Sequence, residues 1–230
     1  MVYVYAVLED MRTCVIIPVF NESRTIGQLV AQIRQHGLEA VVIDDGSRDN
    51  SAQIARDNGA VVLISSLNEG KGSALIKGFD YALANGFDAV IAMDGDGQHL
   101  PENIPSFLEA AENSEAEMII GNRMSETSEM PPLRFLTNKF MSWFLSFLAK
   151  QRIPDTQCGY RLMKRDLLLR INLTTYKFET ESEIIIKAAR LGYKIYSLPI
   201  KTIYRHERSR IDALRDTVRF IRFIIKEMRS

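Results

Sequence analysis

Two carboxylates, Asp94 and Asp96, directly follow a run of apolar residues and are separated by a single glycine, Gly95. Gln98 comes shortly after them, so oxygen-bearing side chains are close together in the sequence. Hard oxygen ligands suit Mg²⁺ or Mn²⁺, and such an ion usually keeps positions open for substrate phosphates. The spacing therefore predicts a divalent metal bound by Asp94, Asp96 and Gln98, and a substrate that carries phosphate. We assign no role to the neighbouring His99.

Polar residues also follow three other apolar segments. They are Asn21-Glu22, Asp44-Asp45 and residues 68–72, which end in Gly-Lys-Gly. In a parallel sheet the carboxyl ends of the strands share one edge, where ligands bind. A single Asp-Gly loop is more often a solvated turn, but stability does not require polar chemistry at every strand end. We therefore expect these loops and the Asp94–Asp96 pair to form one site.

Three common ligand-binding motifs do not match these loops. An EF-hand loop that began at Asp94 would end in glutamate, where this chain has Pro105. A Walker A loop would need glycine in place of Ser65 and serine or threonine in place of Gly72. No Gly-x-Gly-x-x-Gly segment follows the first predicted strand, so the dinucleotide fingerprint is absent. The loops indicate another kind of phosphate ligand.

The elements that must position these residues alternate along the first half of the chain. Apolar segments predict strands, and segments with helical spacing lie between them: strands at 14–19, 40–43, 60–64 and 88–93, helices at 23–35, 49–57 and 73–84. This alternation predicts an α/β fold with a mostly parallel sheet covered on both faces. The second half is less regular: helices at 101–112 and 179–191, a short helix within 162–171, a strand at 116–120 and an extended segment at 193–204.

Two further predicted helices have unusual surfaces. Segment 133–149 is apolar on nearly every side and has basic residues at its flanks, while segment 211–228 is basic and amphipathic. Such helices can lie in a membrane interface beside anionic headgroups; alternatively, the two pack together as a dimer or core surface. The apolar stretch between Lys139 and Lys150 is shorter than the roughly 20 residues that span a bilayer. We expect peripheral contact with a membrane.

Composition is typical of an ordinary globular protein. Of the 230 residues, 46% are hydrophobic, and 29 Lys and Arg balance 29 Asp and Glu, so net charge identifies no partner and gives no sign of nucleic-acid binding. Two cysteines make neither a disulfide framework nor a zinc site, which favours a reducing cytoplasm. Without repeats or linkers, we expect one domain over residues 11–230. Residues 1–10 would be an extension, with Met11 as an alternative start.

The polar motifs, taken together, resemble family 2 glycosyltransferases of the GT-A fold. They lie at residues 17–22, 42–47, 68–72 and 94–99. Residues 121–123 and 155–161 narrow the resemblance to dolichyl-phosphate mannose synthases and other polyprenyl-phosphate glycosyltransferases. It implies an inverting, metal-dependent transfer of sugar from a nucleotide-diphospho-sugar, GDP-mannose or a UDP-sugar, to a polyprenyl (dolichyl) phosphate. The protein would then be cytoplasmic and peripheral at the cytosolic face of the membrane.

The resemblance also implies residues that hold the donor. It assigns the nucleoside to Pro18, Phe20, Glu22, Ile43 and Asp45. Phe20 offers a flat apolar face to a base, although core packing is equally compatible with its position. Asp45 could accept a hydrogen bond from a base N–H. Asp94, Gly95 and Asp96 would hold the diphosphate, and Lys71 would contact a phosphate.

Acceptor-side residues follow from the same resemblance. Arg123 matches a position used for a sugar or acceptor phosphate, and Arg161, Arg205 and Arg210 add cations that are otherwise a solvated basic face. Segment 207–210 departs from the Gly-Glu-Ser-Lys of mannose synthases. Glu181 is the candidate base for a hydroxyl acceptor, or simply an acid that favours a helix start. We expect Asp96, Arg123 and Glu181 to carry the catalysis.

Two other functions remain open at this stage. A glycosyltransferase with the same donor site could use a soluble or glycan hydroxyl as its acceptor. A non-catalytic nucleotide-sugar-binding protein could keep the donor site without transfer. The base of the donor, its sugar, the acceptor lipid and the oligomeric state are open as well.

Overall fold

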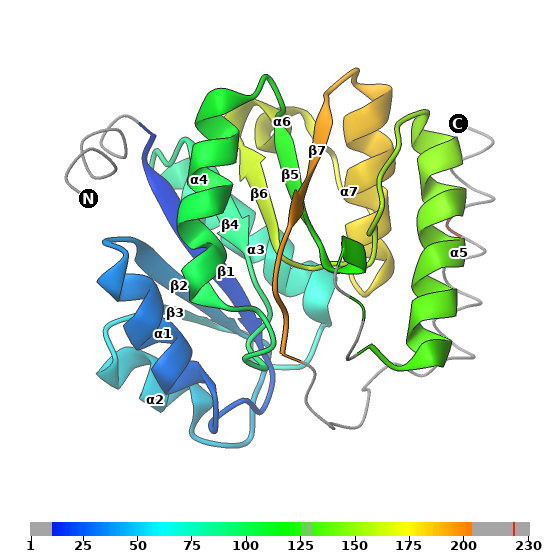
Figure 1. Ribbon diagram of the computed structural model, residues 1–230. Helices are drawn as coiled ribbons and strands as arrows, with labels where there is room; N and C mark the ends of the chain where they lie inside the picture. Colours follow the sequence, from blue (N-terminus) through cyan, green and yellow to red (C-terminus); the bar gives the residue numbers. More distant parts are fainter. Residues whose placement is uncertain (1–10, 126, 128–129, 204–222, 224–230) are drawn as a thin grey trace.

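The computed structural model describes residues 11–125, 127, 130–203 and 223. Within these residues, seven strands form one sheet in the order β3-β2-β1-β4-β6-β5-β7 (Figure 1). The strands are β1 (Thr13–Val19), β2 (Glu39–Asp44), β3 (Val61–Ile64), β4 (Ala89–Ala92), β5 (Met118–Asn122), β6 (Arg161–Lys164) and β7 (Ile195–Pro199). The α-helices are α1 (Ile26–Gln35), α2 (Ser51–Asp57), α3 (Lys71–Ala84), α4 (Ile104–Asn113), α5 (Pro132–Ala149), α6 (Arg165–Arg170) and α7 (Glu179–Arg190).

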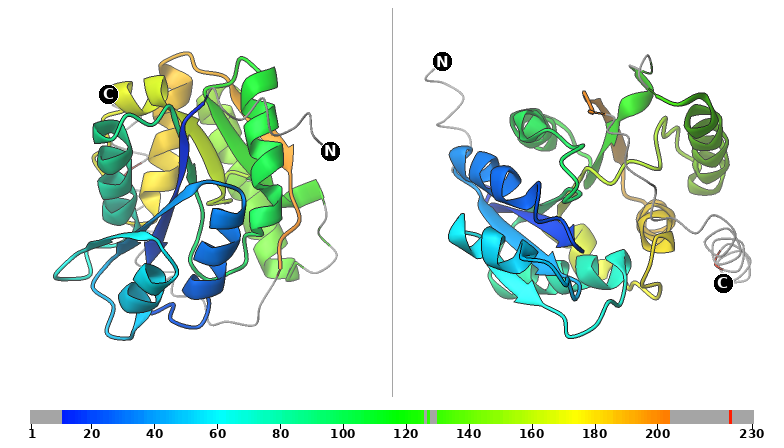
Figure 2. Two further views of the ribbon diagram at one scale, coloured as in Figure 1. Left: turned by 90° about the vertical axis from the view of Figure 1, so that its left-hand side faces the viewer. Right: turned by 90° about the horizontal axis from the view of Figure 1, so that it is seen from below.

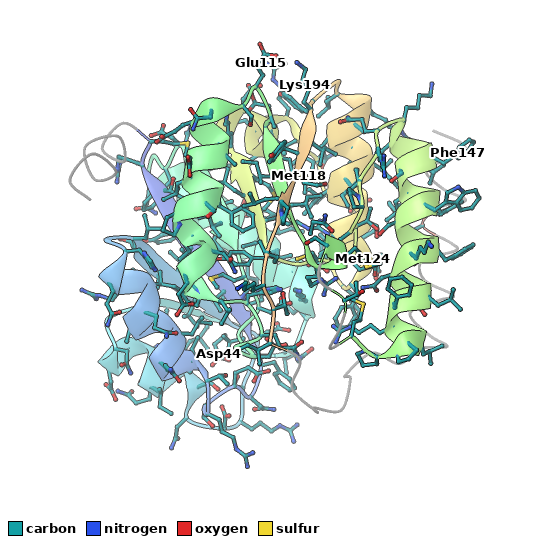
Figure 3. The ribbon with its side chains drawn as sticks, viewed as in Figure 1. Asp44, Glu115, Met118, Met124, Phe147 and Lys194 are labelled. Atoms are coloured by element: carbon teal, nitrogen blue, oxygen red, sulfur yellow. The ribbon has the colours of Figure 1, made fainter. Side chains whose placement is uncertain are left out.

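The central strands β1, β2 and β4 are apolar along most of their length. Strand β1 pairs in parallel with β2 on one side and with β4 on the other. The side chains of β4 and most of those of β1 and β2 are buried, as expected for strands covered on both faces. Their carboxyl ends therefore lie at the same edge of the sheet, where Figure 3 shows Asp44, the last residue of β2.

Helices cover both faces of the sheet. Figures 1 and 2 show α1 and α4 on one face and α3 and α7 on the other. Gly78 allows α3 to lie close to β1 and β2, because a Cβ atom there would lie only 2.5 Å from Cγ2 of Ile16 and 3.0 Å from Cδ1 of Ile43. The predicted α/β sandwich is confirmed, and one main hydrophobic core runs through it.

Residues 162–171 hold a short helix, as predicted, but the strand that precedes this helix was not predicted. The segment starts as strand β6, and only Arg165–Arg170 is helical. Leu162 pairs with Ile91 of β4 and Ile119 of β5, antiparallel to both. The gap between these two strands thus imposes an extended backbone on a sequence with apolar spacing suited to a helix. The sheet is mostly parallel, as predicted, with β6 reversed.

Helix α5 lies at the outside of the molecule and packs against α7 (Figures 1 and 2). Its buried side consists of Asn138, Ser142, Leu145 and Ala149. Its large apolar side chains point outward, as Phe147 does in Figure 3. The exposed set is Leu133, Leu136, Phe140, Trp143 and Phe147, at 61% to 78% exposure. Burial of the helix on all sides, one alternative for an all-apolar helix, is therefore excluded.

The predicted helix at 211–228 lies outside the described residues except for Phe223. That side chain is buried beside Leu145 and Ile186 in a small second cluster. None of the helices in the described part of the chain combines the length and hydropathy needed to cross a bilayer. The division into residues 1–10 and 11–230 stays a prediction.

Candidate functional site

The four polar loops meet at the carboxyl edge of the sheet. The amide of Asp45 donates to the carbonyl oxygen of Val19 at 2.8 Å, which joins the loops after β1 and β2. A Cβ on Gly95 would lie 3.3 Å from the carbonyl oxygen of Pro18, so the loop after β4 packs against the end of β1. The expected convergence of these loops on one edge of the sheet is confirmed; that they form one binding site stays a prediction.

Asp45 connects its loop to residues 68–72. Its two carboxylate oxygens accept the amide N–H groups of Glu69 at 2.9 Å and Gly70 at 2.7 Å. The carboxylate thus holds the backbone that leads into α3, in addition to any nucleoside contact. Pro18, Phe20 and Glu22 are half-buried at this edge, where a nucleoside could reach them. The side chain of Ile43 is fully buried in the core, and its assignment to the nucleoside site stays a prediction.

His99 supports the loop that carries the two carboxylates. Its Nδ1 accepts the amide N–H of Asp94 at 3.0 Å, and its ring stacks on Tyr160 at a centroid distance of 5.1 Å. Burial lowers the pKa of His99, which keeps the ring neutral and Nδ1 able to accept. This role of His99 was not predicted from the sequence. A histidine five residues after the loop's first aspartate was the available signal.

Asp96 is oriented by Gln98. Its Oδ1 accepts the Gln98 amide N–H at 2.9 Å, and its Oδ2 accepts the Gln98 side-chain N–H at 2.8 Å. The side-chain oxygen of Gln98 is therefore not the atom used in this contact. Thr25 donates to the carbonyl oxygen of Gly95 at 2.6 Å and fixes the middle of the loop.

Lys71, Asp94 and Glu181 form a charge cluster. The Lys71 ammonium pairs with Oδ1 of Asp94 and with Oε1 of Glu181, the latter at 3.1 Å. Burial by itself would lower the pKa of Lys71, but the two carboxylates outweigh it and hold that pKa above its ordinary value. Burial would likewise raise the pKa of Asp94, yet Lys71 holds it well below its usual range. Lys71 and Asp94 are therefore charged at neutral pH.

The glycines around this cluster allow close backbone packing. A Cβ on Gly72 would lie 2.5 Å from the carbonyl carbon of Tyr176, and one on Gly70 would lie 2.9 Å from the Tyr176 carbonyl oxygen. The Ser73 amide donates to that oxygen at 3.0 Å. The Gly-Lys-Gly motif thus seats the loop before α7 against the start of α3.

The loop before α7 is held by Glu183, which is fully buried. Its carboxylate accepts the backbone and hydroxyl groups of Thr174 and Thr175, and it pairs with Lys187 at 2.6 Å. Burial opposes ionisation, but these donors, Lys187 foremost, lower the pKa of Glu183. No role of Glu183 was predicted from the sequence. The two threonines that precede the acidic start of the helix are possible donors to such a carboxylate and could have indicated it.

Of the four arginines predicted on the acceptor side, Arg123 and Arg161 lie in the described region, and both are buried and bonded within the protein. Arg123 donates through Nε and Nη2 to the Asp155 carboxylate at 2.7 and 2.9 Å. Arg161 donates to the carbonyl oxygens of Cys158, Thr156 and Glu181 at 2.6 to 2.9 Å. The interpretation of Arg161 as a phosphate ligand is wrong, because all of these bonds go to backbone that it holds together. Arg205 and Arg210 lie outside the described residues.

The residues of the loop fit a divalent metal whose shell is completed by substrate. Among the described residues, no three His, Cys, Asp or Glu side chains converge as a ready-made metal site. The carboxylates of Asp94 and Asp96 and the side-chain oxygen of Gln98 are nevertheless the hard donors that Mg²⁺ prefers. This ion commonly takes one or two carboxylates plus phosphates and water. Asp96 is better placed than Asp94, which is paired with Lys71.

Comparison with known proteins identifies relatives that match most of the chain. A model of "Glycosyl transferase family 2" matches residues 14–171. A UDP-N-acetylglucosamine–dolichyl-phosphate N-acetylglucosaminyltransferase of Methanococcus voltae is 29% identical, covering 86% of this chain and 88% of its own. An undecaprenyl-phosphate mannosyltransferase of Micrococcus luteus is 30% identical, covering 85% of both chains.

Solved structures show the same fold. Glucosyl-3-phosphoglycerate synthase of Mycobacterium tuberculosis, in complex with Mn²⁺, UDP-glucose and phosphoglyceric acid, superposes with a TM-score of 0.74. The match covers 97% of this chain and 82% of that one, at 19% identity. At this identity the likeness concerns the fold, and it agrees with the predicted GT-A architecture.

Proposed function

Because the chain belongs to glycosyl transferase family 2, we propose that it transfers a sugar from a nucleotide-diphospho-sugar to a polyprenyl phosphate, with inversion at the anomeric carbon. The observation that carries the proposal is the similarity to two enzymes named for dolichyl and undecaprenyl phosphate. Each matches at least 85% of this chain. The carboxylate pair at the sheet edge supplies the donor side of such a reaction.

Donor binding is proposed to use the loops after β1, β2 and β4. Phe20 and Glu22 would contact the nucleoside, with Asp45 close behind them. A divalent metal, Mg²⁺ or Mn²⁺, would be held by Asp96 with Asp94 and Gln98. When bound it would offset the charge of the diphosphate and stabilise the departing nucleoside diphosphate. Two observations support this assignment. Asp94 and Asp96 are partly exposed, and the Gln98 side chain donates its N–H to Asp96, so its oxygen is not used in that bond.

A phosphate acceptor is already an anion, so it needs no general base. It needs screening from the carboxylates at the edge. We propose that Arg123 contributes to this screening, together with Arg205 and Arg210. The fork of Arg123 on Asp155 fixes the guanidinium directly after β5, at the same edge as the other loops.

A hydroxyl acceptor is the second candidate. It is favoured by one contact: Glu181 lies beside the donor-side carboxylate, with both carboxylates bound to Lys71. A general base must come within about 3 Å of the hydroxyl that it activates, and Glu181 opens α7 at that side of the site. The identity of the acceptor therefore decides whether Glu181 acts as a base.

Peripheral membrane contact at the cytosolic face is part of the proposal. The exposed apolar side of α5 provides aromatic and aliphatic groups for the interface. Residues 130–154 include four basic residues and no acidic one, so this region complements anionic headgroups. A polyprenyl phosphate presents its phosphate at that interface, so docking would bring the acceptor to the enzyme.

The test is transfer to a defined lipid. The purified protein is incubated with Mn²⁺, a short polyprenyl phosphate in detergent, and either GDP-mannose, UDP-glucose or UDP-N-acetylglucosamine. Mass spectrometry should detect a glycosylated polyprenyl phosphate with one of these donors. The matched control is the same polyprenol without phosphate, which should receive no sugar. Transfer to free sugars or to the alcohol alone would favour the hydroxyl acceptor and contradict the proposal.

A further inference from the structure

Lys71 lies between carboxylates from two distant parts of the chain. It is the first residue of α3, while Asp94 belongs to the loop after β4 and Glu181 to the first turn of α7. All three side chains are largely buried, at 16% to 29% exposure. The ammonium therefore stands where the donor-side loop and the acceptor-side helix come together.

Gly159 shows how closely the three groups converge. A Cβ atom at this position would lie 2.9 Å from Oε1 of Glu181, 3.0 Å from Nζ of Lys71 and 3.1 Å from Oδ2 of Asp94. All three charged atoms thus meet over one backbone position, where an added methyl group would displace them. Arg161 holds the backbone on both sides of this contact, because it donates to the carbonyl oxygens of Cys158 and Glu181.

We propose that Lys71 is a positioning residue that holds Glu181 and the start of α7 against the Asp94 loop, in place of the phosphate contact suggested by its sequence motif. The carboxylates of Asp94 and Glu181 both contact the same ammonium, so without it they would repel each other strongly in this partly buried site. The ammonium compensates for that repulsion and has a hydrogen-bond donor for each. The inference concerns the same site as the proposed function and rests on it only for its kinetic readout.

The contacts around Lys71 explain how its ion pairs can hold the start of α7 in place. The loop before α7 is bound at one end by Glu183 and packs on Gly70 and Gly72 at the other. Lys71 lies between these two glycines, so its pairing with Glu181 adds an ionic contact between α3 and α7 to the packing of the loop. Loss of the ammonium should therefore loosen the first turn of α7 while the rest of the fold stays intact.

Three variants and one control separate this role from a phosphate contact. Lys71→Met removes the charge and keeps most of the stem, and Lys71→Arg keeps a cation that can reach both carboxylates. Gly159→Ala leaves every charge in place but puts a methyl group between them. Lys77→Met is the matched control, because Lys77 lies on the same helix and pairs with Glu69 outside the cluster.

The primary readout is amide hydrogen exchange, which needs no substrate. Exchange in residues 176–183 should rise at least tenfold in Lys71→Met and in Gly159→Ala, return toward wild type in Lys71→Arg, and stay unchanged in Lys77→Met. Unchanged exchange in Lys71→Met would overturn the proposal. So would a binding pattern in which Lys71→Met weakens Mn²⁺-dependent affinity for GDP and UDP more than tenfold while Gly159→Ala leaves both exchange and affinity unaltered.

The kinetic readout applies once transfer has been observed with the wild-type protein. Lys71→Met and Gly159→Ala should each lower kcat at least thirtyfold with a much smaller change in the KM for the donor, and Lys71→Arg should recover a large part of kcat. If the wild type transfers no sugar to polyprenyl phosphate, the proposed function fails, and the exchange experiment still decides the role of Lys71. A KM for the donor that rises in parallel with the loss of kcat would contradict the positioning role.

Discussion

Several charged side chains at the site are held by a partner from another part of the chain. Lys71 joins Asp94 to Glu181, and Arg123 is fixed by Asp155. A buried charge is costly unless it is paired, so these contacts restrict each group to one position before any ligand arrives. Asp96 is held more lightly, by Gln98, and is the carboxylate that we expect to meet a metal.

Substitution Asp96→Ala tests the metal assignment at the level of one residue. It removes the better placed carboxylate oxygens, so the affinity for GDP or UDP measured with Mn²⁺ should fall at least tenfold. Calorimetric titration with and without Mn²⁺ checks this. Asp88→Ala, at the other end of β4, is the control and should leave the affinity unchanged. Equal affinity of Asp96→Ala and wild type would refute the assignment.

Glu183 gives a prediction about pH. Because the pKa of Glu183 is lowered in the folded protein from its ordinary value of 4.5, its stabilising effect is present above that value and is lost as pH falls through the lower folded pKa. Glu183→Gln should reduce the free energy of unfolding by about 2 kcal/mol at pH 7. Urea unfolding should show this difference shrinking below about pH 4.5. A difference that does not depend on pH would contradict the role of the ionised carboxylate.

At the level of elements, α3 and α5 both place small residues on the side that packs against the rest of the protein. On α3, Gly78 brings the helix onto the sheet. On α5, the small and polar side is the buried one, and the aromatic side remains exposed in the described part of the chain. A helix that exposes its largest apolar groups has a surface suited to a lipid interface.

Gly78→Ala tests the close approach of α3. Alanine is the better helix former by about 1 kcal/mol, so helix propensity alone predicts stabilisation. The Cβ would, however, lie 2.5 Å from Cγ2 of Ile16 and 3.0 Å from Cδ1 of Ile43, both in the fully buried core. We therefore expect a net loss of about 1 to 3 kcal/mol in urea unfolding. A variant as stable as the wild type would show that α3 can shift outward freely.

The exposed side of α5 predicts binding to anionic membranes. The double substitution Trp143→Gln and Phe147→Gln should reduce sedimentation with phosphatidylglycerol-containing liposomes several-fold without lowering the melting temperature, since both side chains are mostly exposed. Leu169→Gln, a change at a residue with 60% exposure on α6, is the matched control. Equal sedimentation of the double variant and the control would argue against α5 as the membrane contact.

At the level of the whole molecule, the reversed strand β6 decides how the two halves meet. It is inserted between β4 and β5, so the loop before it reaches the sheet edge beside Asp94. Residues 155–159 bring Asp155 to Arg123 and Gly159 to the Lys71 cluster. The mixed part of the sheet therefore assembles the side of the site that we propose for the acceptor, and the parallel part assembles the side that we propose for the donor.

The parallel half of the fold and the donor loops could be predicted from the sequence, because apolar periodicity and turn residues are local properties of the chain. The same holds for the family, since its motifs are short and contiguous. Strand β6 and the choice of which α5 side chains face outward could not be predicted. Each depends on which distant residues pack beside it: β4 and β5 impose the extended backbone of β6, and α7 selects the buried side of α5. The partners of Lys71, Arg161 and His99 likewise come from the tertiary structure, because a sequence motif specifies which charges are present but not which groups neutralise or orient them.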